Sequence, residues 1–192
     1  MKKHSVNLFK NIDKSWTLFL DRDGVINKRI PDNYVLEWNQ FEFLHGVLEA
    51  LKVFSSVFGK IIIVTNQQGI GKGYMTETDL LKIHSNMISE IEKFGGRVDA
   101  VYFSPFLKES NHHTRKPNVG MALQAKKDFP EIDLKKSVMA GDSLSDMEFG
   151  HRAGMCNILI SDEAEIAKKN HEIVNYLFPD LKTFSEKFIN LQ

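Results

Sequence analysis

The feature that most constrains the fold of this chain is an alternation of short apolar runs with longer segments of helical periodicity. The apolar runs lie at residues 16–20, 60–65, 100–103, 137–140 and 157–160. Helical patterns occupy residues 46–58, 76–94, 118–127 and 145–153. Runs that are apolar at nearly every position need burial on both faces, and such strands alternate with helices in α/β proteins. We therefore expect an α/β, three-layer Rossmann-like fold with a central parallel sheet.

The chain has no Pro/Gly-rich linker, low-complexity tract or internal repeat, which predicts one domain spanning residues 1–192. We expect a core over about 16–162, with residues 163–192 packing onto it. The spacing of Leu181, Phe184 and Phe188 predicts an amphipathic helix over 180–189, packed against the sheet edge. Thr76 followed by Asp79 predicts a capping box that begins the helix at 76–94.

The charges and the single cysteine disfavour several classes of protein, although a local basic patch remains open. Lys+Arg and Asp+Glu are both 25, so the chain lacks the positive excess typical of proteins that bind nucleic acids or anionic membranes. Cys156 stands alone and forms neither an intramolecular disulfide nor a site with several thiolates. No segment approaches ~20 consecutive apolar residues, and the N-terminus lacks a signal-peptide core. We expect a cytoplasmic monomer whose partner is a small molecule.

Polar side chains cluster where the apolar runs end. Asp21 and Asp23 follow the first run, Thr65 ends the second, Lys116 precedes a helix, and Asp142 follows the fourth run. Ligand sites of open parallel sheets lie beyond the carboxyl ends of the strands, so these side chains should meet there. Carboxylates can hold a hard cation or attack phosphorus, while a hydroxyl and an ammonium group can bind phosphate oxygens. The pattern predicts a phosphoryl-transfer site.

Four strings resemble, in order and strand context, the motifs of haloacid-dehalogenase-like phosphohydrolases, subfamily IIIA: DRDGVIN (21–27), VTNQQGIGKGY (64–74), RKPNVGM (115–121) and AGDSLSD (140–146). Residues 18 to about 160 are similar to the branch containing D-glycero-D-manno-heptose 1,7-bisphosphate phosphatase and histidinol-phosphate phosphatase. The resemblance implies a Mg²⁺-dependent phosphatase of a small phosphorylated metabolite that works through an aspartyl-phosphate. A sugar bisphosphate such as D,D-heptose 1,7-bisphosphate is the first expectation. Histidinol phosphate and other sugar or polyol phosphates are alternatives.

The resemblance also implies a role for each motif residue. Asp21 is the nucleophile, and Asp23 is the general acid and base. Mg²⁺ is held by the Asp21 side chain, the Asp23 backbone carbonyl and Asp142, whereas Thr65 and Lys116 bind the transferring phosphoryl group. Asp146 either positions Lys116 or the metal waters, or is a carboxylate at a helix N-terminus. The residues expected to bind substrate are Asn66, Gln67, Arg115 and Ser143.

The chain departs from that branch in the loop before the RKP string. Relatives usually carry a structural zinc there, bound by three cysteines and a histidine, but residues 104–114 contain no cysteine. His112 and His113 lack a soft partner, so we expect no zinc and a solvent-exposed or substrate-facing role for this pair. Ser143 stands where the branch usually has lysine. The intervals after the first and third runs are too short for a folded cap, which predicts a capless enzyme with Lys28, Arg29 and Asn33 free to contact ligand.

Three other functions remain as alternatives. A signalling receiver would place its phosphorylated aspartate after the third run, but Phe103 is followed there by Ser104 and Pro105. A catalytically silent binding module is disfavoured because Asp21 and Asp23 are both present. A phosphatase of polynucleotide ends is weakened by the balanced charge.

Overall fold

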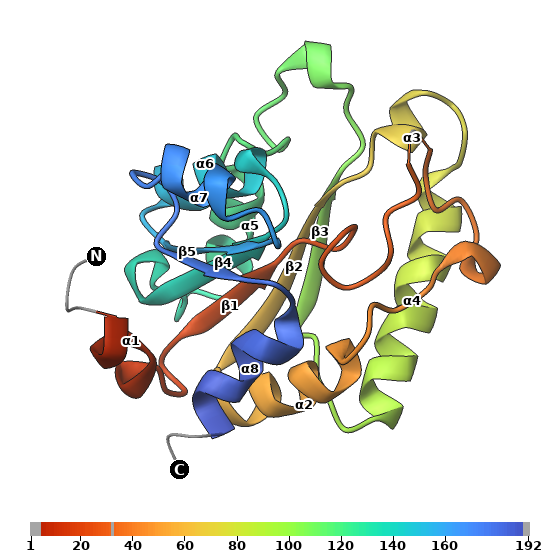
Figure 1. Cartoon of the computed structure of the whole chain (residues 1–192). Coiled ribbons are helices and arrows are strands. Elements are labelled where there is room, and N and C mark those ends of the chain that lie inside the picture. Colours follow the sequence, from red (N-terminus) through yellow and green to blue (C-terminus); the bar gives the residue numbers. More distant parts are fainter. Residues whose placement is uncertain (1–4, 32, 190–192) are drawn as a thin grey trace.

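A six-stranded sheet with strand order β3-β2-β1-β4-β5-β6 forms the centre of the molecule. The computed structural model describes residues 5–31 and 33–189. Each neighbouring pair of strands is parallel, as Figure 1 shows. The strands are β1 (Thr17–Leu20), β2 (Lys60–Asn66), β3 (Ala100–Ser104), β4 (Ser137–Gly141), β5 (Cys156–Ile160) and β6 (Tyr176–Phe178). The predicted α/β fold with a parallel sheet is confirmed.

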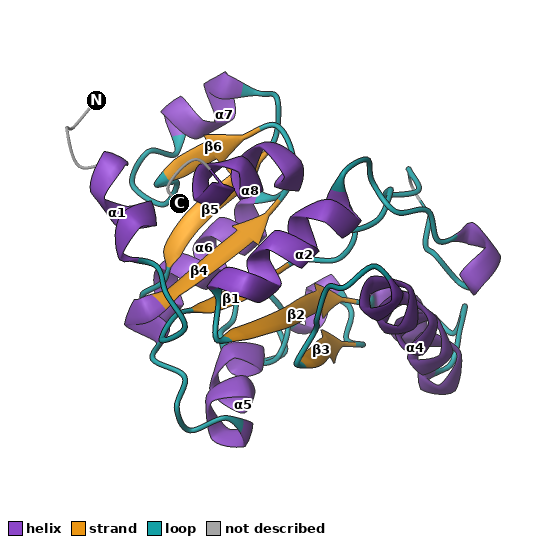
Figure 2. Cartoon of the chain, turned by 90° about the horizontal axis from the view of Figure 1, so that it is seen from below, coloured by secondary structure: helices purple, strands orange, loops and turns teal. Residues whose placement is uncertain are grey.

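Alternate residues of the strands face two separate apolar layers, because successive side chains of a strand point to opposite faces. Leu18 and Leu20 of β1 pack in the larger layer, whereas Phe19 packs in the smaller one. The larger layer is covered by α2 (Val47–Val57), α4 (Glu77–Lys93) and α8 (Leu181–Ile189), and the smaller by α5 (Gly120–Asp128) and α6 (Leu144–Ala153). Figure 2 shows helices on both sides of the sheet. This three-layer arrangement leaves the carboxyl ends of the strands open to ligand.

Helix α4 begins as the sequence predicts. The Thr76 side chain accepts a hydrogen bond from the Asp79 backbone N–H, and the Asp79 carboxylate accepts one from the Thr76 backbone N–H. This reciprocal pairing satisfies two backbone donors that the first turn would otherwise leave free. Buried Leu80, Ile83 and Met87 then hold one face of the helix against the sheet.

The C-terminal region meets the expectation in part. Helix α8 packs mainly against α2, with Phe184 lying 4.9 Å from Phe54 between ring centroids. Phe184 also lies 5.4 Å from Phe178 of β6, a three-residue strand at the sheet edge that the sequence pattern did not predict. The short helices α1 (Ser5–Asn11), α3 (Gln68–Gly71) and α7 (Ala164–Lys169) were also unpredicted. Their lengths are too small to produce a recognisable periodicity.

The two long loops at the open end of the sheet contain only short helical turns. Residues 21–46 include the 3-10 turn η1 (Trp38–Gln40), and residues 105–119 include η2 (Lys108–Ser110). Across the described residues, neither loop contains a folded insert, in agreement with the capless prediction. None of the helices in those residues combines the length and the apolar character that crossing a bilayer requires.

Candidate active site

A cavity of about 520 Å³ opens at the carboxyl ends of β1, β2 and β4, and its floor is built around Asp21. Asp21 follows β1 directly, and its backbone N–H donates to the Ala140 carbonyl at 3.0 Å, which extends the β1–β4 pairing to this residue. Only 8% of the residue is exposed. Burial, followed by repulsion from Asp146, raises the pKa of Asp21 to about 7 despite the opposing charge of Lys116. A nucleophilic oxygen in this position is presented by a rigid strand.

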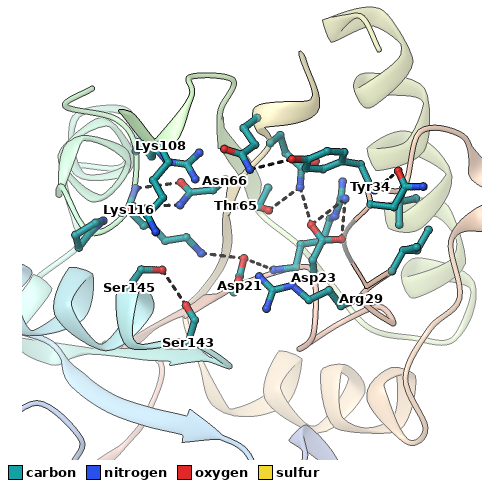
Figure 3. A pocket seen from close by; sticks show the side chains of 18 of the residues that line it. Asp21, Asp23, Arg29, Tyr34, Thr65, Asn66, Lys108, Lys116, Ser143 and Ser145 are labelled. Carbon is teal, nitrogen blue, oxygen red and sulfur yellow. Dashed lines mark hydrogen bonds and ion pairs between the residues drawn. The ribbon is translucent and has the colours of Figure 1, made fainter. Parts of the chain in front are cut away.

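Lys116 is the cation of the floor, and it is 3% exposed. Its Nζ lies 2.8 Å from Asp21 Oδ1 and 2.6 Å from Asp146 Oδ1, and it donates to the Val64 carbonyl at 2.8 Å. Burial lowers the pKa of Lys116, but the two carboxylates outweigh that effect and raise it above its usual value. A permanent positive charge therefore lies beside the Asp21 carboxylate (Figure 3).

Three carboxylates face one another across the floor. Each of Asp21, Asp142 and Asp146 contributes one carboxylate oxygen to a group whose members lie within 4.8 Å of one another. Burial and the charge of Asp146 raise the pKa of Asp142 to about 6. The buried Asp142 Oδ1 has no hydrogen-bond partner among the described residues, while Oδ2 lies 3.3 Å from Arg29 Nη1. An all-oxygen donor set with an unpartnered buried oxygen fits a hard divalent cation such as Mg²⁺.

Asp146 combines two of the roles that the sequence left open. Its Oδ2 accepts hydrogen bonds from the Ser143 hydroxyl at 2.6 Å and the Ser143 backbone N–H at 3.1 Å, which caps α6. Its Oδ1 pairs with Lys116. The same carboxylate therefore fixes the helix start and the ammonium group.

Asp23 lies close to Asp21 in sequence but has a different environment. Its carboxylate accepts bidentate hydrogen bonds from Arg22 Nη2 at 2.9 and 3.0 Å, and others from Asn27 at 3.0 Å and Gln67 at 2.7 Å. Burial raises the pKa of Asp23, but the Arg22 charge and these hydrogen bonds outweigh it and lower the pKa below its usual value. The side chain is an ionised carboxylate when the pocket holds no anion.

The β1 loop turns sharply after Asp23 through Gly24, whose φ is 91°. That backbone conformation is rarely adopted by residues with a side chain. A Cβ at this position would also collide with the Asp142 carboxylate. The turn therefore brings the β1 loop and the end of β4 into direct contact.

Residues at the end of β2 organise the pocket through contacts to protein groups. Thr65 is 1% exposed, and its Oγ1 accepts from Gln67 Nε2 at 2.8 Å, which leaves the hydroxyl hydrogen free to donate. The Asn66 amide pairs with the backbone of Lys116, donating to its carbonyl at 3.1 Å and accepting from its N–H at 3.0 Å. Asn66 and Gln67 line the pocket, but their amides are used to fix Lys116, Thr65 and Asp23.

Four further pocket-lining residues, Arg29, Tyr34, Lys108 and Arg115, are defined here as the pocket rim. Figure 3 labels the first three of them. Arg115 Nη1 donates to the Phe106 carbonyl at 2.8 Å, and Tyr34 accepts a hydrogen bond from Gln68 at 2.9 Å. Ser143 and Asn33 also line the pocket. Lys28 instead pairs with Glu42 at 3.5 Å, and both side chains are largely exposed. Positive charge is thus available at the rim as well as at the floor.

The histidine pair of residues 104–114 divides into two environments. His113 is exposed, as the sequence predicts. His112 is half-buried, with its ring 3.4 Å from the Phe106 ring between centroids and its Nδ1 2.8 Å from Thr114 Oγ1. Neither histidine lines the pocket among the described residues, so a substrate-facing role for them is not supported.

The buried Arg22–His84 pair was missed by sequence reasoning. Arg22 is fully buried, and its Nη1 lies 3.1 Å from His84 Nε2 on α4. Because Arg22 is a donor, Nε2 of His84 is the acceptor and the imidazole is neutral. Burial and the Arg22 charge lower the pKa of His84 to about 3. The DRDG string places Arg22 next to the site residues Asp21 and Asp23. Its contact with His84 depends on tertiary packing and is not visible in the sequence.

A search among protein families matches residues 12–179 to the family described as polynucleotide kinase 3 phosphatase. A D-glycero-alpha-D-manno-heptose-1,7-bisphosphate 7-phosphatase of Mycobacterium bovis is 39% identical over 145 residues, covering 73% of this chain and 76% of the relative. A D-glycero-beta-D-manno-heptose-1,7-bisphosphate 7-phosphatase of Helicobacter pylori is 40% identical over 144 residues, covering 74% of this chain and 82% of the relative.

The chain is also similar in fold to solved structures. The D,D-heptose 1.7-bisphosphate phosphatase of B. bronchiseptica, complexed with magnesium and phosphate, aligns with a TM-score of 0.82 and 26% identity. The alignment covers 92% of this chain and 99% of that structure.

Proposed function

The chain belongs to the polynucleotide kinase 3 phosphatase family of haloacid-dehalogenase-like phosphatases, and on this premise we propose that it removes a phosphate group from a sugar bisphosphate such as D-glycero-D-manno-heptose 1,7-bisphosphate. The observation that carries the proposal is the placement of Asp21, a buried carboxylate at the end of β1 and 2.8 Å from Lys116 Nζ. A carboxylate held beside a cation and further acidic side chains is arranged for attack on a bound phosphoryl group.

In the proposed first half-reaction, an Asp21 carboxylate oxygen bonds to phosphorus while the bond from phosphorus to the leaving oxygen breaks. Thr65 donates its free hydroxyl hydrogen to a phosphoryl oxygen. Lys116 neutralises charge that develops on the transferring group, and it needs no movement because Asp146 and the Val64 carbonyl already fix its Nζ. The product is a phosphorylated Asp21.

Asp23 is the proposed proton donor to the leaving oxygen and, in the second half-reaction, the base that takes a proton from the attacking water. The Arg22, Asn27 and Gln67 contacts lower its pKa in the free pocket. A dianionic phosphate beside it would favour its protonated form through repulsion between like charges. Water then bonds to phosphorus, the bond to Asp21 breaks, and inorganic phosphate leaves.

The proposed ligands of Mg²⁺ are the side chains of Asp21 and Asp142 and the backbone carbonyl of Asp23. Asp146 lies in the same acidic cluster and pairs with Lys116. The cation supplies charge neutralisation that allows an anionic nucleophile to approach an anionic phosphate. No zinc is proposed, because residues 104–114 offer no thiolate. Elemental analysis of the active purified protein should detect no stoichiometric zinc.

Support for the substrate comes from the relatives and from the rim. Relatives named for the alpha and the beta anomer are similarly identical to this chain, at 39% and 40%. Arg115, Lys108 and Arg29 provide positive charge around the opening, which suits a substrate that carries a second anionic group. These observations favour a heptose bisphosphate without selecting an anomer.

The proposal is tested by phosphate release with Mg²⁺ from both heptose bisphosphate anomers and from histidinol phosphate. We expect the highest kcat/KM on one heptose anomer, and Asp21→Asn should abolish turnover and the acid-stable phosphoprotein. The neutral amide is a poor nucleophile and a weaker cation ligand. Full activity of Asp21→Asn would rule out the covalent mechanism, whereas preference for histidinol phosphate would change only the substrate.

A second candidate is suggested by the description of the matching family, which refers to polynucleotide 3′ ends. The balanced charge of the chain, 25 basic and 25 acidic residues, disfavours it because nucleic-acid binding relies on a positive surface. A 3′-phosphorylated oligonucleotide added to the same substrate panel decides between the two. Its turnover at a rate comparable to the heptose substrate would favour the second candidate.

A further inference from the structure

The loop between β3 and α5, residues 105–119, carries Arg115 and Lys116 but has little regular structure. Its second half is anchored by Asn118, which donates to the Asn111 and His112 carbonyls at 3.1 Å, and by the Gly120 N–H bond to His113 at 3.0 Å. These contacts do not involve Phe106. The first half is held partly by the Gly71 N–H, which donates to the Pro105 carbonyl at 3.1 Å, and partly by other contacts.

Those contacts come from Ser104, Phe106, His112 and Thr114, which we name the aromatic clasp. The His112 and Phe106 rings are stacked, with centroids 3.4 Å apart and an interplanar angle of 19°. Thr114 Oγ1 lies 2.8 Å from His112 Nδ1 and donates to Ser104 Oγ at 3.2 Å. Ser104 is fully buried at the end of β3. The clasp thus joins both halves of the loop to the buried end of the edge strand β3.

The clasp reaches the pocket through one backbone group. The Phe106 carbonyl accepts a hydrogen bond from Arg115 Nη1 at 2.8 Å, and Arg115 lines the pocket. Stacking on His112 restricts Phe106, although 38% of that residue is exposed. A restricted Phe106 gives its carbonyl a fixed position, and a fixed acceptor selects one orientation of the Arg115 guanidinium.

We propose that His112 is a positioning residue for substrate binding, acting through Phe106 to orient Arg115 toward the bound substrate without entering the pocket itself. The proposal rests on the proposed function, since it assigns Arg115 to the substrate. The proposal gives the clasp no role in positioning Lys116, because Asp21, Asp146 and the Val64 carbonyl hold the Lys116 Nζ. Loss of the clasp should therefore change binding more than chemistry.

Steady-state kinetics on D-glycero-D-manno-heptose 1,7-bisphosphate test this separation. His112→Ala should raise KM by about fivefold and change kcat by less than about twofold, because the affected contact binds substrate equally in the ground and transition states. His112→Phe, which can keep the stack on Phe106, should recover part of the loss. His171→Ala is the control, because this histidine is exposed and its Nδ1 lies 3.3 Å from the Lys168 carbonyl, outside the loop of residues 105–119, and it should keep the wild-type KM.

A double-mutant cycle distinguishes positioning from general damage to the loop. In an Arg115→Ala background, His112→Ala should have no additional effect on KM, because its only proposed target is already absent. An equal effect in both backgrounds, an equal loss in kcat, or an unchanged KM in the single variant would each overturn the proposal.

Amide hydrogen exchange of the free protein provides a readout that is independent of substrate. His112→Ala should speed exchange in residues 105–114 by at least about threefold, with β4 unchanged, whereas His171→Ala should leave both segments as in the wild type. If the heptose substrate is not hydrolysed, the proposed function fails, and this experiment still decides whether the clasp orders the loop. Unchanged exchange in residues 105–114 would show that it does not.

Discussion

The floor and the rim of the pocket are built in opposite ways. At the floor, Lys116 and Asp146 are buried and paired at 2.6 Å. At the rim, Arg29 has a side chain that is 63% exposed, and Arg115 is held by a single backbone carbonyl. Buried, multiply bonded charges cannot rearrange cheaply, whereas exposed ones can adapt to a ligand. Under the proposed function, the difference places chemistry at the floor and selection of substrate at the rim.

Replacing the floor cation should have the largest effect. Lys116→Ala is expected to lower kcat by about 100- to 1000-fold, because a preorganised charge is lost where the transition state forms. It should also lower the free energy of unfolding by about 3 kcal/mol, since Asp21 and Asp146 lose their buried partner. Phosphate-release assays measure the change in kcat, and urea unfolding measures the change in the free energy of unfolding.

The exposed Lys126 of α5 supplies the control for that experiment. Lys126→Ala removes the same charge from the surface and should leave kcat and stability within error of the wild type. Retention of more than a tenth of the wild-type kcat in Lys116→Ala would remove the proposed distinction between floor and rim.

A smaller effect is expected at the rim. Arg115→Ala should raise KM by about tenfold, corresponding to roughly 1.4 kcal/mol of charge-assisted binding, with kcat changed much less. Lys28→Ala is the matched control, because Lys28 pairs with Glu42 and does not line the pocket. A loss confined to kcat in Arg115→Ala would show that Arg115 acts in the chemical step, as proposed for the floor residues, and not in substrate binding.

The remaining effect concerns the dependence of stability on pH. The pKa of His84 is lowered to about 3 in the folded state from 6.5, so between these values the unfolded chain binds a proton that the folded chain does not. The contribution of neutral His84 to the free energy of unfolding is present above pH 6.5. It is lost as pH falls, by up to about 1.4 kcal/mol per pH unit. His84→Gln, which keeps an acceptor for Arg22, should reduce this slope in urea unfolding across pH 4–6.

His151→Gln serves as the control because His151 is exposed on α6. It should retain the wild-type slope. An identical slope in His84→Gln and the wild type would mean that His84 does not account for the loss of stability in acid.

The sequence predicts the parallel sheet because its central strands are apolar on both faces, as in Leu18, Phe19 and Leu20. The capping box at Thr76 is likewise a local signal. The packing of α8 against α2 could not be derived, because an apolar stripe does not specify which neighbouring surfaces it contacts. β6 has three residues, too few for any pattern.

At the site, the sequence identifies which side chains meet but not how they are paired. Asp21, Thr65 and Lys116 were predicted to converge, and they do so because parallel strands end at one edge. That Asn66 binds the Lys116 backbone, and that Arg22 is fully buried against His84, depends on contacts between distant segments. Residue type alone cannot distinguish an amide that binds ligand from one that binds protein.

The contact between Gly24 and Asp142 has a consequence for the study of related chains and mutant libraries. Position 24 has a positive φ, and its missing Cβ leaves space that the Asp142 carboxylate occupies. A chain that keeps every acidic residue but replaces this glycine should have a displaced Asp142 and a degraded form of the proposed cation site. Position 24 can therefore serve as a marker of inactive homologues that an inspection of the acidic residues alone would count as intact.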